Sequence, residues 1–151
     1  LHDALPIYFA APDPEGKGAA LAMRNAVRQA GIPVDQIGYV NTHGTSTPLG
    51  DIAELKGVYE LLNGSGTNAH VGSTKSYHGH LLGAAAGLEG IITALAIKNS
   101  IVPANINIFN LDPGTPPLQL PTEIVEKEIP AALSNSFGFG GHNSCMVLKK
   151  I

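Results

Sequence analysis

The sequence predicts an α/β fold with a mixed, mostly parallel sheet and a buried helix rich in glycine and alanine. Two observations support this prediction. Short apolar runs alternate with longer stretches of helical spacing, and helical crossovers of that kind make neighbouring strands parallel. Near the C-terminus, two strands joined by a glycine-rich turn add an antiparallel member to the sheet.

The individual elements follow from apolar spacing and from their start and stop signals. Helices are expected over 17–30, 48–62 and 81–98, and strands over 37–40, 70–74, 131–136 and 144–149. Gly31 ends the first helix, and Thr47 and Pro48 are the expected N-cap and first residue of the second. A brief edge segment is expected at 101–102, and the prolines that follow it predict a long loop over 103–130.

Two of these elements are expected in the interior. The segment Cys145–Leu148 is apolar throughout, which predicts a central strand. The stretch from Leu81 to Ile97 has Glu89 as its single charge, so it has almost no polar face and is expected to lie buried between layers. It also falls short of the ~20 residues of a membrane span, which favours a core helix.

Composition limits the classes of function. The chain has 151 residues, of which 44% are hydrophobic, enough for one domain with a real core. The net charge of −3 and the pI near 6.0 argue against a nucleic-acid surface. The single cysteine, Cys145, excludes an internal disulfide and fits a reducing compartment. Residues 1–7 have no basic region and do not resemble a signal peptide.

Polar side chains gather directly after the first predicted strand. His43 follows that strand, Gly44 allows a sharp turn, and Thr45, Ser46 and Thr47 place three hydroxyls nearby. Ligands of open α/β sheets bind beyond the carboxyl ends of the strands. The segment is therefore a candidate site, although taken alone it also fits a loop histidine that is satisfied by its neighbours.

A second group lies at the start of the glycine and alanine helix. His80 precedes that helix, and the positive end of a helix dipole disfavours imidazolium, so His80 is expected to stay neutral and to donate to a developing oxyanion. Glu89 is a buried carboxylate that needs a partner, and Lys75 is the available cation. The pair either serves catalysis or fastens strand to helix, and for Glu89 the structural role is the expected one.

Three other patterns are interpreted as structural. His70, His78 and His80 have no cysteine or carboxylate at ligand spacing, so no metal site is expected. The glycine run Gly138–Gly141 precedes no helix and is read as a turn rather than a phosphate loop. Cys145 lies inside an apolar strand and is expected to be inert.

Three motifs occur in order, and together they are far more specific than any one of them. They are Asn41–Asp51, Ser73–Ala85 and Asn135–Gly141. These motifs resemble the C-terminal half of β-ketoacyl-acyl-carrier-protein synthases, the type II elongating condensing enzymes of fatty-acid synthesis. The resemblance implies a thiolase-like fold, of which this chain is the second of two pseudo-equivalent halves. It divides the chain into a non-family stretch, 1–7, and a synthase domain, 8–151.

The resemblance also implies roles for individual residues. The implied catalytic residues are His43, His80 and Lys75. Glu89 is implied as their structural support. Three residues are implied to bind substrate. Thr45 and Thr47 hold the phosphopantetheine arm, and Phe139 gates the acyl pocket. The chain departs from the family pattern at Tyr77–His78 and Ala86, and the match at His142–Asn143 is looser, which leaves the preferred acyl-chain length open.

The implied reaction is a decarboxylative Claisen condensation of a malonyl thioester with an acyl-enzyme thioester. Two neutral histidines stabilise the enolate by hydrogen bonds, and the carbanion attacks an acyl group held on a cysteine. The family's cysteine belongs to the first half, so this chain is expected to be inactive alone. The chemistry needs no metal or organic cofactor, because the phosphopantetheine arrives on the acyl carrier protein.

The implied partners are the acyl carrier protein, malonyl and acyl thioesters, and a second copy in a full-length homodimer, without nucleic acid or membrane. The implied location is the cytoplasm, or a plastid or the mitochondrial matrix in a eukaryote. The alternatives are a non-catalytic chain-length subunit, a polyketide ketosynthase domain and thiolase proper. The first has little reason to retain His43, Lys75 and His80 together, and Cys145 fits the second reactive cysteine of a thiolase poorly.

Overall fold

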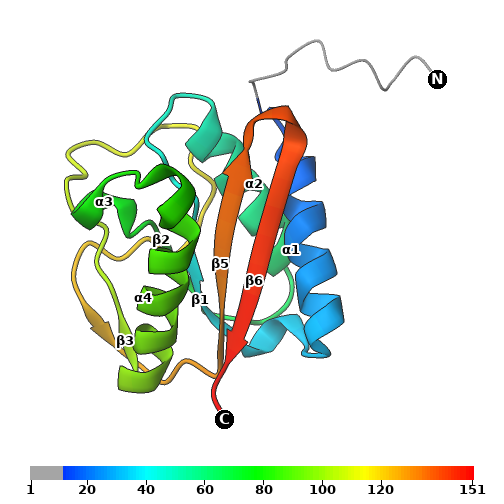
Figure 1. The fold of residues 1–151 in the computed structure, drawn as a ribbon, viewed down its shortest axis with the longest axis vertical. Helices are drawn as coiled ribbons and strands as arrows, with labels where there is room; N and C mark the ends of the chain where they lie inside the picture. The colour runs from blue at the N-terminus through cyan, green and yellow to red at the C-terminus, as the bar shows by residue number, and fades with distance from the viewer. Residues whose placement is uncertain (1–11) are drawn as a thin grey trace.

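The computed structural model describes residues 12–151, so the predicted boundary after residue 7 lies outside the described part. A four-stranded sheet with the order β2-β1-β5-β6 forms the centre (Figure 1). Its strands are β1 (Ile37–Asn41), β2 (His70–Gly72), β5 (Ala131–Gly138) and β6 (His142–Lys149). The helices are α1 (Lys17–Ala30), α2 (Gly50–Leu62), α3 (Lys75–His78) and α4 (Ala85–Asn99). A separate two-stranded ribbon joins β3 (Ile101–Val102) to β4 (Val125–Glu126).

The pairing confirms a mixed, mostly parallel sheet. β1 pairs in parallel with both β2 and β5, because a helix or a long connection returns the chain before each of these pairings. β5 and β6 are antiparallel and joined by the short turn Phe139–Gly141. As a result, β1, β2 and β5 all end at the same edge, the upper one in Figure 1.

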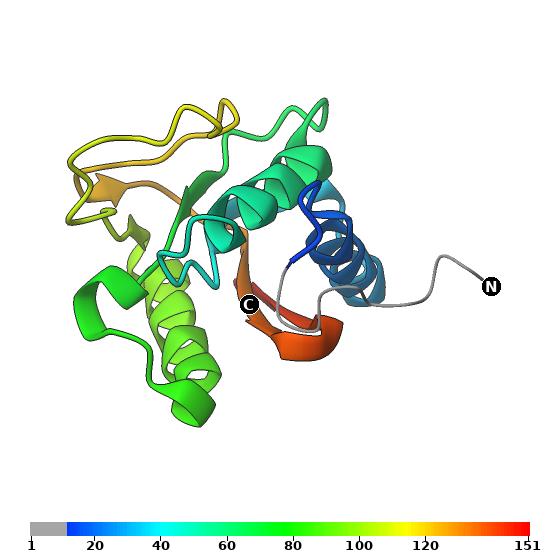
Figure 2. The same ribbon diagram turned by 90° about the horizontal axis from the view of Figure 1, so that it is seen from above.

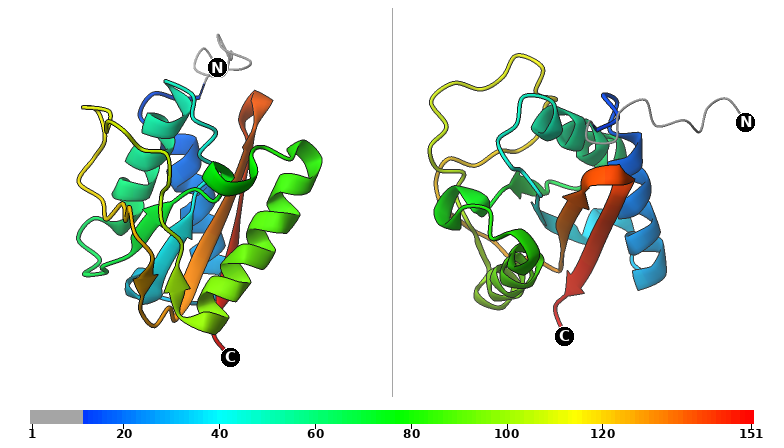
Figure 3. Two further views of the ribbon diagram at one scale, coloured as in Figure 1. Left: turned by 90° about the vertical axis from the view of Figure 1, so that its left-hand side faces the viewer. Right: turned by 45° about the horizontal axis from the view of Figure 1, so that its top comes forward.

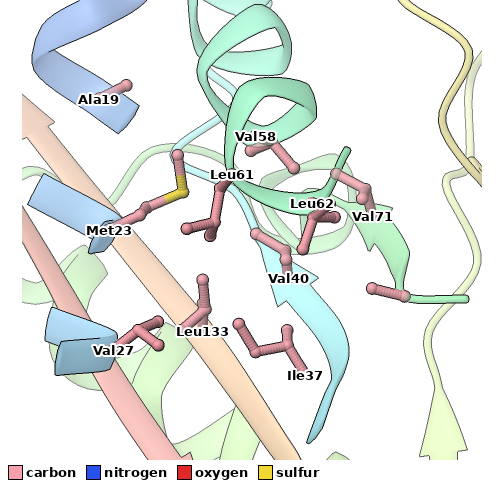
Figure 4. Packing of buried hydrophobic residues seen from close by; sticks show 11 residues of the cluster. Ala19, Met23, Val27, Ile37, Val40, Val58, Leu61, Leu62, Val71 and Leu133 are labelled. Carbon is pink, nitrogen blue, oxygen red and sulfur yellow. The ribbon is translucent and has the colours of Figure 1, made fainter. Parts of the chain in front are cut away.

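Helices cover both faces of this sheet. α1 and α2 pack against each other on one face, and α4 packs on the other (Figures 2 and 3). Alternate side chains of a strand point to opposite faces, so Val40 of β1 enters the α1/α2 core while Tyr39 faces α4. Figure 4 shows the first core, in which Met23, Val58 and Leu133 interdigitate with Val40.

Helix α1 spans the predicted residues. Its first turn is held by Asp13, whose carboxylate accepts the backbone N–H of Lys17 at 3.1 Å. It ends at Gly31, where φ is 64°, a left-handed conformation that glycine adopts without a Cβ penalty. Local signals therefore fixed both ends of α1.

Helix α2 begins at Gly50, two residues later than predicted, so Pro48 is not its first residue. The predicted capping contact of Thr47 is nevertheless present, and the carbonyl of Thr47 also accepts the N–H of Asp51 at 3.4 Å. Pro48 lies in a turn, and Thr47 Oγ1 accepts the N–H of Gly50 at 3.2 Å from outside the helix. The carboxylate of Asp51 reaches back to the N–H of Ser46 at 3.1 Å. This backward contact holds the polar segment as a loop rather than as a first helical turn.

Helix α4 differs from its prediction in start and in burial. It begins at Ala85, after a short 3-10 turn over Leu82–Ala84 in which Leu82 has a φ of 50°. One side packs on the sheet, while Ile91 is 62% exposed and Leu95 49% exposed on the other. The expected burial between layers is therefore wrong for the described residues, because the sheet and the β3–β4 ribbon cover only one side of this helix. None of the helices in residues 12–151 has the length and apolarity to cross a membrane.

Strand β6 is at the edge of the sheet, so the prediction of a central strand is wrong. The strand is apolar because helices cover both of its faces. Val147 packs toward the α1/α2 core, and Leu148 packs toward α4. Both C-terminal strands are longer than predicted, and the 103–130 segment contains β4 in addition to loop.

Candidate active site

The predicted site residues lie at the edge where β1, β2 and β5 end. His43 follows β1, Lys75 and His80 follow β2, and Phe139 follows β5. The strands are parallel, so three segments that are distant in sequence reach one place. This geometry is the crevice beyond the carboxyl strand ends that open α/β sheets use for ligands.

The two histidines meet there. The ring centroids of His43 and His80 are 5.5 Å apart, with an interplanar angle of 89°. The ring of Phe137, which sequence reasoning missed, lies 6.1 Å from His43 and forms a wall beside it. The arrangement places two imidazole rings next to each other at the edge of the sheet.

A backbone contact fixes the tautomer of His80. The N–H of Leu82 donates to His80 Nδ1 at 3.1 Å, so in the neutral ring the hydrogen is on Nε2. His80 lies ahead of the 3-10 turn and not at the first turn of α4, so the prediction that it sits at that helix N-terminus is wrong. The Leu82 contact, and not the helix dipole, makes Nε2 the donor.

His43 is held neutral by its surroundings. Burial, with smaller contributions from the Lys75 charge and from His80, lowers its pKa from 6.5 to about 4. Neutral imidazole carries one N–H donor, which is the form that hydrogen-bonds a developing oxyanion.

Lys75 and Glu89 form the predicted ion pair. Their side chains are 5% and 1% exposed, and the ammonium and carboxylate are in direct contact. Asn41 holds the two segments together, because its amide donates to Thr93 Oγ1 at 3.2 Å and its Oδ1 accepts the N–H of Thr74 at 3.2 Å. The pair is fastened between β1, α3 and α4, and the charge of Lys75 acts on His43 by lowering its pKa.

The three predicted substrate-binding residues are accessible. Thr45 is half-buried. Thr47 is exposed and lines an open cavity of about 580 Å³, whose walls also include Asp51 and Ser73. Phe139 is 79% exposed, in a turn with Gly140 at φ 76°. In the described residues Phe139 is not a core aromatic.

Other candidates are structural. His78 Nδ1 donates to the carbonyl of Gly79 at 2.7 Å, which ties its ring to the local loop. Burial raises the pKa of the Cys145 thiol to about 12, so its nucleophilic thiolate is scarce at neutral pH. Within residues 12–151, no group of three or more histidine, cysteine or acidic side chains is placed to hold a metal ion.

Sequence reasoning also missed Glu54 and Asn135. Glu54 is 4% exposed and its carboxylate accepts the backbone N–H groups of His43 and Gly44 as well as the amide of Asn135. A signal was present, because Glu54 lies one helical turn before buried Val58 and a carboxylate on an apolar stripe demands partners. Asn135 opens the third motif, but nothing in its place in the sequence pointed to a contact with α2.

Fold and site together define an α/β protein with a mixed sheet that carries two neighbouring histidines at the carboxyl edge of its parallel strands. The chain matches the family described as "Beta-ketoacyl synthase, C-terminal domain" over residues 8–109, and it belongs to that family. The resemblance inferred from the three motifs is thereby confirmed.

The relatives include the 3-oxoacyl-[acyl-carrier-protein] synthase 2 of Vibrio harveyi, which is 47% identical over 145 residues. The match covers 95% of this chain and 35% of that protein, so the chain spans about a third of the length of this curated relative.

Solved structures agree. One is the AntDE:AntF assembly, described as a type II PKS acyl-carrier protein in complex with its ketosynthase, with a TM-score of 0.90 and 28% identity over 97% of this chain and 36% of that one. Another is the ketosynthase ApeO in complex with its chain length factor ApeC from Xenorhabdus doucetiae. It has a TM-score of 0.87 and 37% sequence identity, and the match covers 96% of this chain and 36% of that one. The thiolase-like α/β fold is therefore confirmed.

Proposed function

We propose that this chain is the C-terminal half of an enzyme similar to 3-oxoacyl-[acyl-carrier-protein] synthase 2, and that it supplies the histidines that stabilise the enolate in condensation. The observation that carries the proposal is the meeting of His43 and His80 at the carboxyl edge of the sheet. The name of the Vibrio harveyi relative supports acyl thioesters on a carrier protein as the substrates.

In the proposed reaction, the malonyl thioester loses CO₂ when its carbon–carbon bond breaks and the electron pair moves into an enolate. His80 donates from Nε2 to the enolate oxygen, and the neutral ring of His43 donates a second hydrogen bond. The enolate carbon then attacks the acyl thioester on a cysteine, and the thiolate leaves as the new carbon–carbon bond forms.

Cys145 does not serve as that cysteine, because burial raises the pKa of its thiol to about 12. The nucleophile comes from a part of the enzyme outside these 151 residues. The charge of Lys75 helps keep His43 neutral, and Glu89 keeps that ammonium in place. Thr45 and Thr47 hold the phosphopantetheine arm that the carrier protein brings, and Phe139 gates the acyl pocket.

The test is His43→Ala in the full-length protein, with malonyl decarboxylation and acyl transfer to the cysteine measured separately. Loss of one oxyanion donor costs about 10²–10³ in rate, so decarboxylation should fall by that factor while acyl transfer stays largely intact. Equal loss of acyl transfer with surviving decarboxylation contradicts the proposed role of His43.

A second candidate function is that of a non-catalytic subunit that sets chain length. The similarity to a ketosynthase whose structure was solved with its chain length factor supports this alternative. The retention and close approach of His43, His80 and Lys75 favour the catalytic reading. For a non-catalytic subunit, His43→Ala would leave decarboxylation by its partner unchanged.

A further inference from the structure

Glu54 is a buried carboxylate that the proposed reaction does not use. Its Oε1 accepts the N–H of His43 at 2.9 Å and the amide of Asn135 at 3.0 Å, and its Oε2 accepts the N–H of Gly44 at 3.0 Å. One side chain of α2 thus binds the turn after β1 and the interior of β5.

The two backbone contacts flank the α-carbon of His43. The N–H of His43 belongs to the peptide plane before that carbon, and the N–H of Gly44 belongs to the plane after it. A single carboxylate that holds both N–H groups fixes the relative orientation of the two planes, and therefore φ and ψ of His43.

The His43 ring depends on this backbone for its aim. Its Nδ1 is buried and has no hydrogen-bond partner among the described residues, and the rings of His80 and Phe137 lie beside it. A buried imidazole with no such anchor points where its backbone directs it.

The backbone of the turn at Gly44 is also held by a second contact, with Ser73. Gly44 has a φ of 35°, and its carbonyl accepts the hydroxyl of Ser73 at 3.0 Å. A Cβ at Gly44 would lie 2.5 Å from Ser73 Cβ. Ser73 therefore fixes the carbonyl of Gly44, and Glu54 fixes its N–H.

We propose that Glu54 is the positioning residue of His43, and that its carboxylate sets the imidazole for the decarboxylation step by accepting from the N–H groups on both sides of His43. This inference rests on the proposed function. All three partners of Glu54 are donors, which matches the acceptor oxygens of a carboxylate. Burial raises the pKa of Glu54, and the three hydrogen bonds oppose that rise. Asn135 completes the contact by holding the carboxylate from the β5 side.

Glu54→Gln in the full-length protein tests the proposal. The amide keeps the shape of the side chain but places an NH₂ donor against a backbone N–H, which leaves a buried donor unsatisfied. A displacement of about 1 Å can cost about 10² in rate, so malonyl decarboxylation should fall by about that factor while acyl transfer to the cysteine changes less than about threefold.

The matched control is Glu60→Gln, the same change on the same helix at an exposed ion pair with Arg24. It should alter neither step. If Glu54→Gln lowers both steps in parallel with the thermal midpoint, or leaves decarboxylation at the level of the control, Glu54 is not a positioning residue and the proposal is overturned.

If Glu54→Gln does not fold, Glu54→Asp replaces it, because the shorter acid keeps its charge but cannot reach both N–H groups. The same selective loss is expected, and a uniform loss again overturns the proposal. His43→Ala, measured in parallel, separates the two hypotheses. If His43→Ala removes decarboxylation and the Glu54 variants do not, only the positioning role fails, whereas unchanged decarboxylation in His43→Ala overturns the proposed function itself.

Discussion

His78 and His80 are near neighbours in sequence, yet their ring nitrogens are engaged differently. Both nitrogens of His78 contact the protein, Nδ1 at the carbonyl of Gly79 and Nε2 at 3.3 Å from Thr74 Oγ1. His80 uses Nδ1 for the N–H of Leu82 and so keeps its hydrogen on Nε2. The left-handed φ of Leu82, unusual for a residue with a branched side chain, is part of the turn that carries this contact.

The pKa of His43 gives a prediction at the same scale. The folded pKa of about 4 is below the ordinary 6.5, so the folded state binds fewer protons than the unfolded state between these values. The contribution of His43 to stability is therefore complete above about pH 6.5 and is lost as the pH falls toward 4. NMR titration of ¹³C-labelled histidine in the full-length protein should show a His43 midpoint near 4, and a midpoint near 6.5 would contradict the burial argument.

Phe139 provides the second prediction for a single residue. Its ring is 79% exposed, so Phe139→Ala should change the free energy of unfolding by no more than about 0.5 kcal/mol. If the ring gates the acyl pocket, the same change should alter which chain lengths load onto the cysteine while decarboxylation stays comparatively unaffected. Loading rates across chain lengths, measured alongside thermal stability, test this, and an unchanged loading profile rejects the gate.

At the scale of elements, the contact between α1 and α2 depends on small residues. A Cβ at Gly57 of α2 would lie 2.8 Å from the carbonyl oxygen of Gly16 and 3.0 Å from Ala19 Cβ. The first of these neighbours is backbone and cannot rotate away. Close approach of the two helices is what lets Met23 and Val58 meet in the core shown in Figure 4.

Gly57→Ala should therefore destabilise the protein although alanine is the better helix former. Overpacking costs about 1–3 kcal/mol and the gain in helix propensity is about 1 kcal/mol, so the net loss should reach up to about 2 kcal/mol. The thermal midpoint of the full-length protein should fall. A midpoint equal to or above that of the parent would show that α1 and α2 can separate without cost.

At the scale of the whole molecule, one side of the described chain presents apolar side chains to solvent. Leu82 is 78% exposed, Ile91 62%, Leu95 49% and Met146 48%, on α4, the turn before it and the edge strand β6. Exposed apolar side chains that gather on one face are typical of a surface that a partner covers.

The isolated 151-residue chain is accordingly expected to fold poorly and to have no condensing activity. It offers an uncovered apolar face and no thiol suited to hold the acyl group. Purified chain should associate in gel filtration and melt without a cooperative transition. A cooperative melt together with acyl-thioester condensation would contradict both parts of this expectation.

The sequence by itself determined the features that local physics controls. The apolar run of β1 and the periodicity and αL stop of α1 were enough to place those elements, because propensity and capping act over a few residues. The need of buried Glu89 for a cation predicted its pairing with Lys75, since an unpaired buried charge is too costly. The three ordered motifs identified the family.

Only the tertiary structure decided what depends on contacts between distant segments. An apolar strand sequence indicates that both faces of the strand are covered, but it does not indicate whether another strand pairs on each side. The edge position of β6 therefore could not be predicted from its residues. The turn that fixes His80 and shifts the start of α4 exists because Leu82 accepts a φ that its own side chain disfavours. The contacts of Glu54 with the His43 turn and with Asn135 join three elements, and hydrogen bonds of that kind have no sequence period, so they arise only when the chain has folded.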